Sequence, residues 1–327
     1  MQDTVVSKNV EIKNLKLVII KTLVFFDLFN QPLSLFEIYK YLNIKAELFE
    51  ILDCLENLKD KIENKDGFYY LQGREKLVKE RFKKYNYFKR KTKKAFLFSK
   101  LISFFPTVRG VAVSNIIADH NLRDESDIDL FIISSKNKIW LTRFFCVSLA
   151  KFLNLRPNRK TKKDKICLSF YVSEGNLNLE KYLYNQKDLY FIYWLIGLQI
   201  LVNKGGVFNR LELENKWIKK YLPNIGETIF SSIVPIKDDF QLFLDLDINP
   251  SKLPQVQDWK NKKNKDSKGF FENLSKKIQL KIMPNELKSK ECDFGGVILK
   301  DDIIKLFLED KRPEFIERFE SNLKKYL

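Results

Sequence analysis

Residues 126–133 read Ser-Asp-Ile-Asp-Leu-Phe-Ile-Ile, so two carboxylates stand at the entrance of an apolar run. Such a run is typical of a strand buried on both faces, with its polar start at the edge of a sheet. Residues i and i+2 of a strand point to the same face, and Asp127 and Asp129 are therefore expected to project side by side. Two carboxylates that close repel each other unless a cation lies between them, and Mg²⁺ or Mn²⁺ suits such an oxygen pair.

Asp-x-Asp alone favours a solvated loop end before a core strand, but the preceding residues shift the balance toward the metal site. Residues 108–114 read as another short apolar strand, and residues 115–118 as a helical turn. The order of strand, turn, spacer and Ser-Asp-x-Asp resembles the DNA polymerase beta superfamily of nucleotidyltransferases. In that family a Gly-Ser pair closes the first strand and holds the phosphates of the nucleotide, while the aspartates hold the metal ions.

The resemblance implies roles for individual residues of this chain. Asp127 and Asp129 would be the catalytic metal ligands, and Ser114, Asn115 and Ser126 would contact the nucleotide. Two features depart from the family pattern. Ser114-Asn115 stands where the family has Gly-Ser, and serine lacks the backbone freedom of glycine.

The second departure concerns the third carboxylate, which the family carries on a later strand. The matching candidate strand, residues 166–172, contains no acid, and only Asp164 and Glu174 flank it. Either acid is a candidate for the third position if the strand register allows it. The resemblance covers roughly residues 106–173.

Positive charge is concentrated in two segments of this 327-residue chain, whose net charge is +17. Residues 75–100 contain eleven Lys or Arg side chains and two Glu, on a predicted long helix. This helix fits either a nucleic-acid contact or a solvated lysine-rich face. Residues 156–165 form a basic loop expected to attract a triphosphate or nucleic acid. Its phosphate-binding candidates are Arg159, Lys160, Lys162 and Lys163.

Residues 1–74 predict three helices and a hairpin, an arrangement similar to a winged helix. Ser34 and Glu37 form a capping-box signal, and Asp66-Gly67 predicts the hairpin turn. A winged helix usually binds DNA through its third helix. Here that helix carries Glu47, Glu50, Asp53, Glu56 and Asp60. Phosphates would be repelled, so a structural or protein-docking role is favoured.

The fold class expected from these segments is α+β. We predict a winged-helix-like domain (1–74), a basic linker helix (75–105), a small mixed-sheet nucleotidyltransferase-like domain (106–222) and a mostly helical C-terminal region (223–327). Helices are expected over four later stretches: Leu179–Lys204, Leu211–Tyr221, Ile303–Phe307 and Pro313–Tyr326.

Several motifs and segments are absent from the sequence. It has no P-loop or dinucleotide-binding glycine pattern, and its lone histidine, His120, excludes a multi-histidine metal cage. The four cysteines, Cys54, Cys146, Cys167 and Cys292, lack metal or disulfide spacing and are expected to be buried free thiols in a reducing compartment. Without a signal peptide or membrane-length apolar run, we expect a cytoplasmic protein with no membrane partner.

Two functions follow from these observations. The first is a metal-dependent nucleotidyltransferase that moves a nucleoside monophosphate from a nucleoside triphosphate to an unknown acceptor, such as a nucleic acid or a protein. The second is a catalytically degenerate fold that binds a nucleotide, a nucleic acid or a protein. The retained Ser-Asp-x-Asp favours the enzyme, whereas the two departures favour the binding module.

Overall fold

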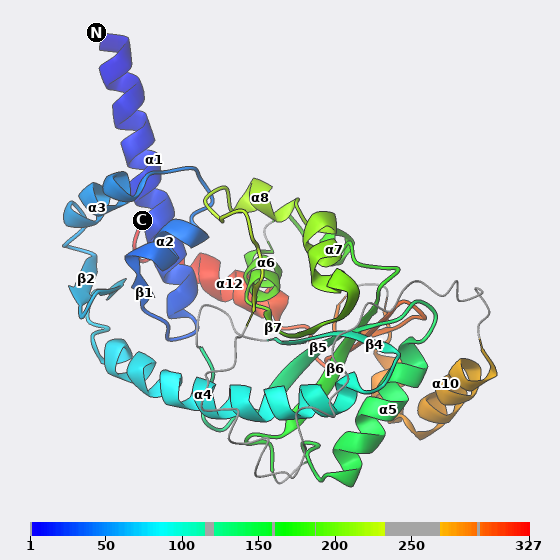
Figure 1. The fold of residues 1–327 in the computed structure, drawn as a ribbon. Helices are drawn as coiled ribbons and strands as arrows, with labels where there is room; N and C mark the ends of the chain where they lie inside the picture. The colour runs from blue at the N-terminus through cyan, green and yellow to red at the C-terminus, as the bar shows by residue number, and fades with distance from the viewer. Residues whose placement is uncertain (1, 115–120, 159–160, 187, 233–268, 293–294) are drawn as a thin grey trace.

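The computed structural model describes residues 2–114, 121–158, 161–186, 188–232, 269–292 and 295–327. Its helices accompany two separate β-sheets, one of three strands and one of seven (Figure 1). The protein is therefore mixed α+β, as the sequence predicts at this level. None of the helices in the described ranges has the length and apolar character that a membrane crossing requires.

The first unit contains three helices and the small sheet, whose strand order is β1-β3-β2. The predicted capping box is present, because Ser34 Oγ accepts from Glu37 N and Glu37 Oε2 accepts from Ser34 N. Asp66 and Gly67 turn the hairpin with positive φ angles of 53° and 77°, a geometry that glycine favours. The elements are α1 (Gln2–Asp27), β1 (Leu33–Ser34), α2 (Leu35–Tyr41), α3 (Leu48–Glu56), β2 (Ile62–Lys65) and β3 (Phe68–Leu71).

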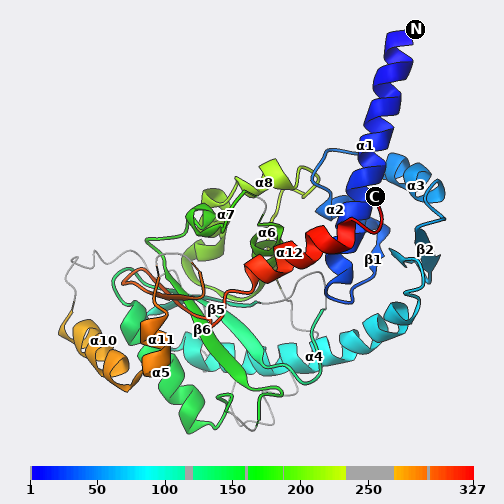
Figure 2. The same cartoon turned by 180° about the vertical axis from the view of Figure 1, so that it is seen from behind.

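A long helix, α4 (Lys76–Ser103), leads from this unit to the large sheet. It runs beneath the sheet in Figure 1 and again in the reverse view of Figure 2, and it packs against β4, β5 and β7. The predicted basic helix is confirmed as a helix. Its position brings its basic side chains close to the ends of the central strands.

The seven-stranded sheet has the order β8-β7-β4-β5-β6-β10-β9. The central pair β5 and β6 is parallel, whereas β4 pairs antiparallel with β5, and β10 pairs antiparallel with β6. The strands are β4 (Val108–Val113), β5 (Ile128–Ser134), β6 (Ile166–Ser173), β7 (Gln199–Asn203), β8 (Ser231–Ser232), β9 (Val297–Leu299) and β10 (Ile303–Leu306).

Helices cover both faces of this sheet, which explains the apolar runs of its strands. Ile128, Leu130 and Ile132 pack with residues of α4 and α5. Phe131 and Ile133 point to the opposite face, toward α6 and α7. The helices are α5 (Ile139–Phe152), α6 (Leu189–Ile196), α7 (Val207–Glu214), α8 (Ile218–Tyr221), α10 (Phe270–Ile282), α11 (Asn285–Ser289) and α12 (Arg312–Leu323).

Two of the predicted helices are wrong. The stretch 179–204 contains only a short turn and α6 before it becomes β7, which pairs with β4. The predicted helix at 303–307 is the strand β10. The segments that became β7 and β10 are short, mostly apolar runs, and periodicity alone does not separate a buried helix from a buried strand in such runs. As a result, residues beyond 222 add strands to the same sheet as β4, β5 and β6. The predicted helix at 211–221 forms as two helices, α7 and α8, and the last predicted helix forms as α12.

Candidate metal and nucleotide site

The Asp-x-Asp segment lies at the beginning of β5, as predicted. Asp127 directly precedes the strand and Asp129 is its second residue, and both side chains are half-buried. On the β4 side, Ser114 N donates to the carbonyl of Asp129 at 2.9 Å. On the β6 side, Ile128 N donates to the carbonyl of Lys165 at 2.7 Å. The carboxylates are therefore carried by backbone that is bonded to both neighbouring strands.

A third potential ligand comes from β6. Cys167 is the register partner of Asp129 in the parallel pair. Ligand atoms of Asp127, Asp129 and Cys167 all lie within 4.8 Å of one another, and all three side chains are half-buried. The Cys167 Sγ also lies 2.9 Å from the Ser169 Oγ. Cys167 was not among the predicted ligands, because the family pattern calls for an acid on this strand. The signal available was a metal-ligating residue type near the start of the expected neighbouring strand.

Electrostatics favours a cation at this cluster. Burial raises the pKa of the Cys167 thiol well above its usual range, and the charges of Asp129 and Asp127 raise it further. Negative charge at the mouth of the two strands therefore disfavours a thiolate until a positive charge compensates it. Two carboxylate oxygens and one sulfur form a donor set that fits a divalent cation.

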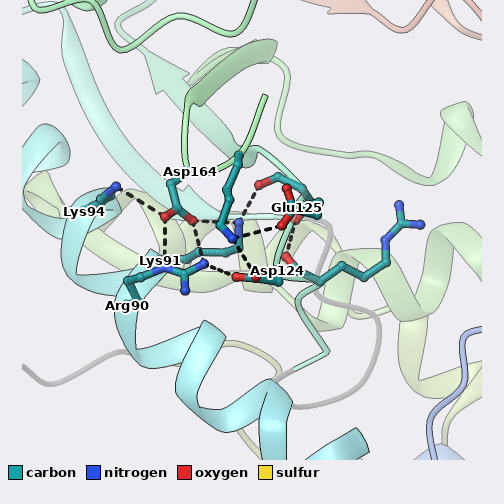
Figure 3. A network of polar contacts seen from close by, with 9 residues as sticks. Arg90, Lys91, Lys94, Asp124, Glu125 and Asp164 are labelled. Carbon is teal, nitrogen blue, oxygen red and sulfur yellow. Dashed lines mark hydrogen bonds and ion pairs between the residues drawn. The ribbon is translucent and has the colours of Figure 1, made fainter. Parts of the chain in front are cut away.

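Asp164, one candidate for the third carboxylate, forms ion pairs with basic side chains of α4. It lies two residues before β6 and faces three basic side chains of α4 (Figure 3). Its carboxylate lies 2.9 Å from Lys91 Nζ, 2.9 Å from Arg90 Nε and 3.3 Å from Lys94 Nζ. Burial alone would raise the pKa of Asp164, but hydrogen bonds from Lys91 and Arg90 outweigh it and lower the pKa to about 2. Asp164 is an ion-pair hub and does not join the Asp127–Asp129 cluster.

The same network extends to the residues just before β5. Asp124 accepts from Lys163 at 2.6 Å and from Arg90 at 2.5 Å, and these bonds lower its pKa (Figure 3). The fully buried Lys91 also donates to the carbonyl of Ser126. The network therefore ties the starts of both parallel strands to α4, one residue away from Asp127.

Glu174, the other candidate, lies at the opposite end of β6. Its carboxylate is 2.7 Å from Arg210 Nη2 and 3.6 Å from Arg109 Nε. Because Cys167 pairs with Asp129 near the start of the strand, Glu174 is separated from the cluster by most of β6. The expectation that Asp164 or Glu174 completes the site is wrong.

The remaining predicted site residues have different surroundings. Ser114 is buried at the end of β4, beside Asp129 through its backbone. The Ser126 hydroxyl donates to the carbonyl of Arg123, and Lys163 is bound to Asp124 and Glu125. Lys162 is exposed. Four further residues of the prediction lie outside the described ranges: Asn115, His120, Arg159 and Lys160.

Much of the positive charge on α4 serves the fold. Arg81 is buried and lies 2.7 Å from Glu37 Oε1, and the buried Lys84 donates to the carbonyl of Asn30. The exposed lysines of the helix are Lys76, Lys79, Lys83, Lys89, Lys93, Lys94 and Lys100, and of these Lys94 also forms an ion pair with Asp164. The helix therefore has an inward-facing set of bases that bind α2, the backbone after α1 and the start of β5, and a second set of exposed lysines.

The surroundings of the cysteines differ from the expectation in part. Cys54 and Cys146 are buried free thiols, as expected, but Cys167 is half-buried and Cys292 is exposed. Cys167 therefore differs from the two core thiols in that it faces polar atoms.

A cavity of about 420 Å³ lies apart from the acids, between α1, α6, α8 and α12. Its walls are largely aromatic and include Phe25, Tyr193 and Phe315. Tyr190 also lines it, and burial, followed by the charge of Asp129, raises the pKa of this tyrosine. Neither Asp127 nor Asp129 lines the cavity, so it is separate from the candidate metal site.

No family model matches the chain, and neither the curated proteins nor the solved structures contain a match to it.

Proposed function

We propose that this chain is a metal-dependent nucleotidyltransferase that transfers a nucleoside monophosphate from a nucleoside triphosphate to an acceptor. One observation carries the proposal. Asp127 and Asp129 occupy the start of a central strand, with a third ligand-type side chain within 4.8 Å on the parallel neighbour. Carboxylates in this position are costly without a cation, so the arrangement favours a divalent metal and a phosphate-containing substrate.

In this proposal the residues of the chain bind and orient the reactants. Asp127 and Asp129 hold the cation, which when bound would neutralise phosphate charge and favour in-line displacement at the α-phosphate. Ser114, whose backbone is bonded to Asp129, places the end of β4 beside the phosphates. The exposed Lys162 adds positive charge from the loop before β6, where it attracts the triphosphate.

The ion-pair network of Arg90, Lys91, Asp124 and Asp164 acts as a positioning device. It anchors the backbone at Ser126 and the side chain of Asp164, which lies two residues before β6, to the helix α4. Because Asp127 directly follows Ser126 and Cys167 lies three residues after Asp164, the network helps to keep the carboxylates and the thiol at a fixed spacing. Preorganised ligands of this kind lower the cost of binding a cation.

The proposal also assigns a role to each domain. Residues 106–222, together with the strands that the C-terminal region adds, form the nucleotidyltransferase-like domain. Residues 1–74 form a winged-helix-like unit with a structural or protein-docking role, because its third helix is acidic. We place the protein in the cytoplasm.

A specific observation also favours the alternative, a nucleotide- or nucleic-acid-binding module without chemistry. Both acids that flank β6 are held in ion pairs, so neither supplies the third carboxylate that would activate an attacking hydroxyl. A protein of this kind binds the triphosphate and the metal but releases no pyrophosphate.

Pyrophosphate release separates the two functions. The full chain is incubated with each labelled nucleoside triphosphate and with Mg²⁺ or Mn²⁺, and both pyrophosphate and labelled acceptors are measured. We expect turnover that Asp129→Asn reduces by at least about 100-fold, the scale of losing one preorganised transition-state contact. Asp60→Asn is the matched control, because Asp60 is an exposed acid of the N-terminal unit, outside both the cluster and the ion-pair network. Binding without turnover over a broad acceptor screen would favour the binding module.

A further inference from the structure

The third side chain of the cluster belongs to β6 and is a thiol. The register of the parallel pair sets Cys167 opposite Asp129, and the ligand atoms of Asp127, Asp129 and Cys167 lie within 4.8 Å of one another. A cation that binds sulfur at about 2.3 Å and oxygen at about 2.0–2.2 Å spans ligand atoms up to about 4.5 Å apart. Small side-chain rotations therefore bring all three atoms onto one ion.

We propose that Cys167 is the third protein ligand of the metal bound by Asp127 and Asp129, and that its sulfur makes the site prefer borderline divalent cations such as Co²⁺ and Zn²⁺ over Mg²⁺. The inference rests on the metal role of the two aspartates in the proposed function. It adds the identity of the third ligand and the class of ion that the site selects.

The surroundings of Cys167 set it apart from the other buried thiols of the chain. Cys146 packs in the apolar cluster between the sheet and α5, and Cys54 packs in the core of the N-terminal unit. Cys167 instead has the Ser169 hydroxyl at 2.9 Å and forms a hydrogen bond with Asp129. A thiol that faces a carboxylate pair is placed as a ligand, because sulfur that only fills space packs against carbon.

Charge supports a cation at this point. Asp127 makes no ion pair with any residue in the described part of the chain, and its neighbours in the cluster are another acid and a thiol. The basic side chains of α4 that reach the starts of the strands, Arg90 and Lys91, form ion pairs with Asp124 and Asp164 instead. A cation bound by the three ligand atoms would compensate the negative charge of Asp127 and its neighbours.

The donor set decides which ion fits best. Mg²⁺ prefers oxygen ligands in a near-ideal octahedron and is bound weakly by sulfur. Softer first-row cations accept a mixed set of carboxylate and thiolate ligands. Replacing the expected third carboxylate by Cys167 therefore moves the preference of the site away from Mg²⁺ while the aspartates keep their position.

Cobalt is the probe for this ligand, because a bond between Co²⁺ and a thiolate gives a charge-transfer absorption band in the near ultraviolet. The full-length protein without nucleotide is titrated with Co²⁺, and Mg²⁺ is then added as a competitor. We expect the band in the wild type and its loss in Cys167→Ser. Loss of an outer-shell partner already lowers metal affinity by roughly 10- to 100-fold, so Cys167→Ser should lower Co²⁺ affinity by at least about tenfold.

Two further variants complete the test. Cys292→Ser removes an exposed thiol and should keep the band, which excludes adventitious cobalt binding there. Cys167→Asp places a carboxylate at the same position and should raise Mg²⁺ affinity relative to Co²⁺. Circular dichroism verifies that each variant is folded.

The outcomes separate the inference from the proposed function. A band that persists in Cys167→Ser, or an unchanged ratio of Co²⁺ to Mg²⁺ affinity in both Cys167 variants, overturns the role of Cys167. Cobalt binding without the band, abolished by Asp127→Asn, also overturns it but leaves the aspartates as the metal site. No divalent binding with or without nucleoside triphosphate overturns both.

Discussion

Two pairs of acids stand at the starts of the neighbouring strands β5 and β6, and their surroundings are opposite. Asp124 and Asp164 are surrounded by four basic side chains: Arg90, Lys91, Lys94 and Lys163. Asp127 and Asp129, which follow Asp124 by only a few residues, share their cluster with the Cys167 thiol instead. Asp124 and Asp164 thus meet basic side chains, whereas Asp127 makes no ion pair with a described residue and lies beside Asp129 and a thiol.

The difference indicates what each pair contributes. Charges buried with a partner hold elements together, and removing one partner leaves the other uncompensated at high cost. Like charges held side by side weaken the fold slightly and become favourable only when a cation binds. Substitutions in the first pair should therefore lower stability, whereas substitutions in the second should lower metal binding and leave the fold intact.

The largest expected effect is that of Asp164→Asn on stability. The substitution leaves the fully buried ammonium of Lys91 without its carboxylate, and breaking a buried ion pair in this way costs about 3–5 kcal/mol. Urea denaturation followed by circular dichroism measures the free energy of unfolding. Asp124→Asn is the control, and because Asp124 and its partners are partly exposed to solvent, it should lower stability much less than Asp164→Asn. Equal losses of stability in the two variants would show that the ion pairs of Asp164 stabilise the fold no more than those of Asp124.

Acid titration of stability tests the same hub without a mutation. The pKa of Asp164 is about 2 in the folded protein, below the value of about 3.9 in an unfolded chain. A depressed folded-state pKa adds stability above pH 4, and this contribution of roughly 2–3 kcal/mol is lost as the pH falls from about 4 to about 2. Unfolding free energies measured at several pH values should show this loss in the wild type. In Asp164→Asn the unfolding free energy should depend less steeply on pH below about pH 4. Parallel curves would assign the acid sensitivity to other carboxylates.

Asp127→Asn should have the opposite signature. Removing one of two neighbouring negative charges relieves repulsion, so the unfolding free energy in the absence of metal should stay within about 0.5 kcal/mol of the wild type. Affinity for Mn²⁺ or Co²⁺ should fall by at least about tenfold, equivalent to about 1.4 kcal/mol. Calorimetry with and without a nucleoside triphosphate measures this change. A variant that loses stability but keeps its metal affinity would mark Asp127 as a structural acid.

The sequence allows the strands that carry both acid pairs to be predicted. Residues 108–113, 128–134 and 166–173 are short apolar runs between polar segments, and each forms a strand. The capping box at Ser34 and the turn at Asp66-Gly67 are local signals, and both form as expected. These features depend on residues within a few positions of one another.

The features that could not be predicted depend on distant residues. Asp164 is an ion-pair hub because α4 crosses near the strand starts, about seventy residues away in the chain, where Lys91, Arg90 and Lys94 reach it. Cys167 joins the cluster because the parallel register sets it opposite Asp129, and no local pattern specifies that register. The runs that became β7 and β10 are short and mostly apolar and carry no clear helix or strand periodicity, so their partners in the sheet decide between helix and strand.

The smallest expected effect separates two adjacent lysines of the loop before β6, Lys162 and Lys163. Lys163 is already bound to Asp124 and Glu125, whereas Lys162 is exposed and makes no ion pair with a described residue. An exposed charge near a phosphate contributes roughly 0.3–1 kcal/mol, so Lys162→Ala should weaken triphosphate binding by about two- to fivefold at low salt, and less at high salt. Lys163→Ala should change affinity less, because its charge is compensated within the protein. Affinity is measured at two salt concentrations. If Lys163→Ala weakens triphosphate binding more than Lys162→Ala does, the triphosphate breaks the ion pairs of Lys163 with Asp124 and Glu125 when it binds.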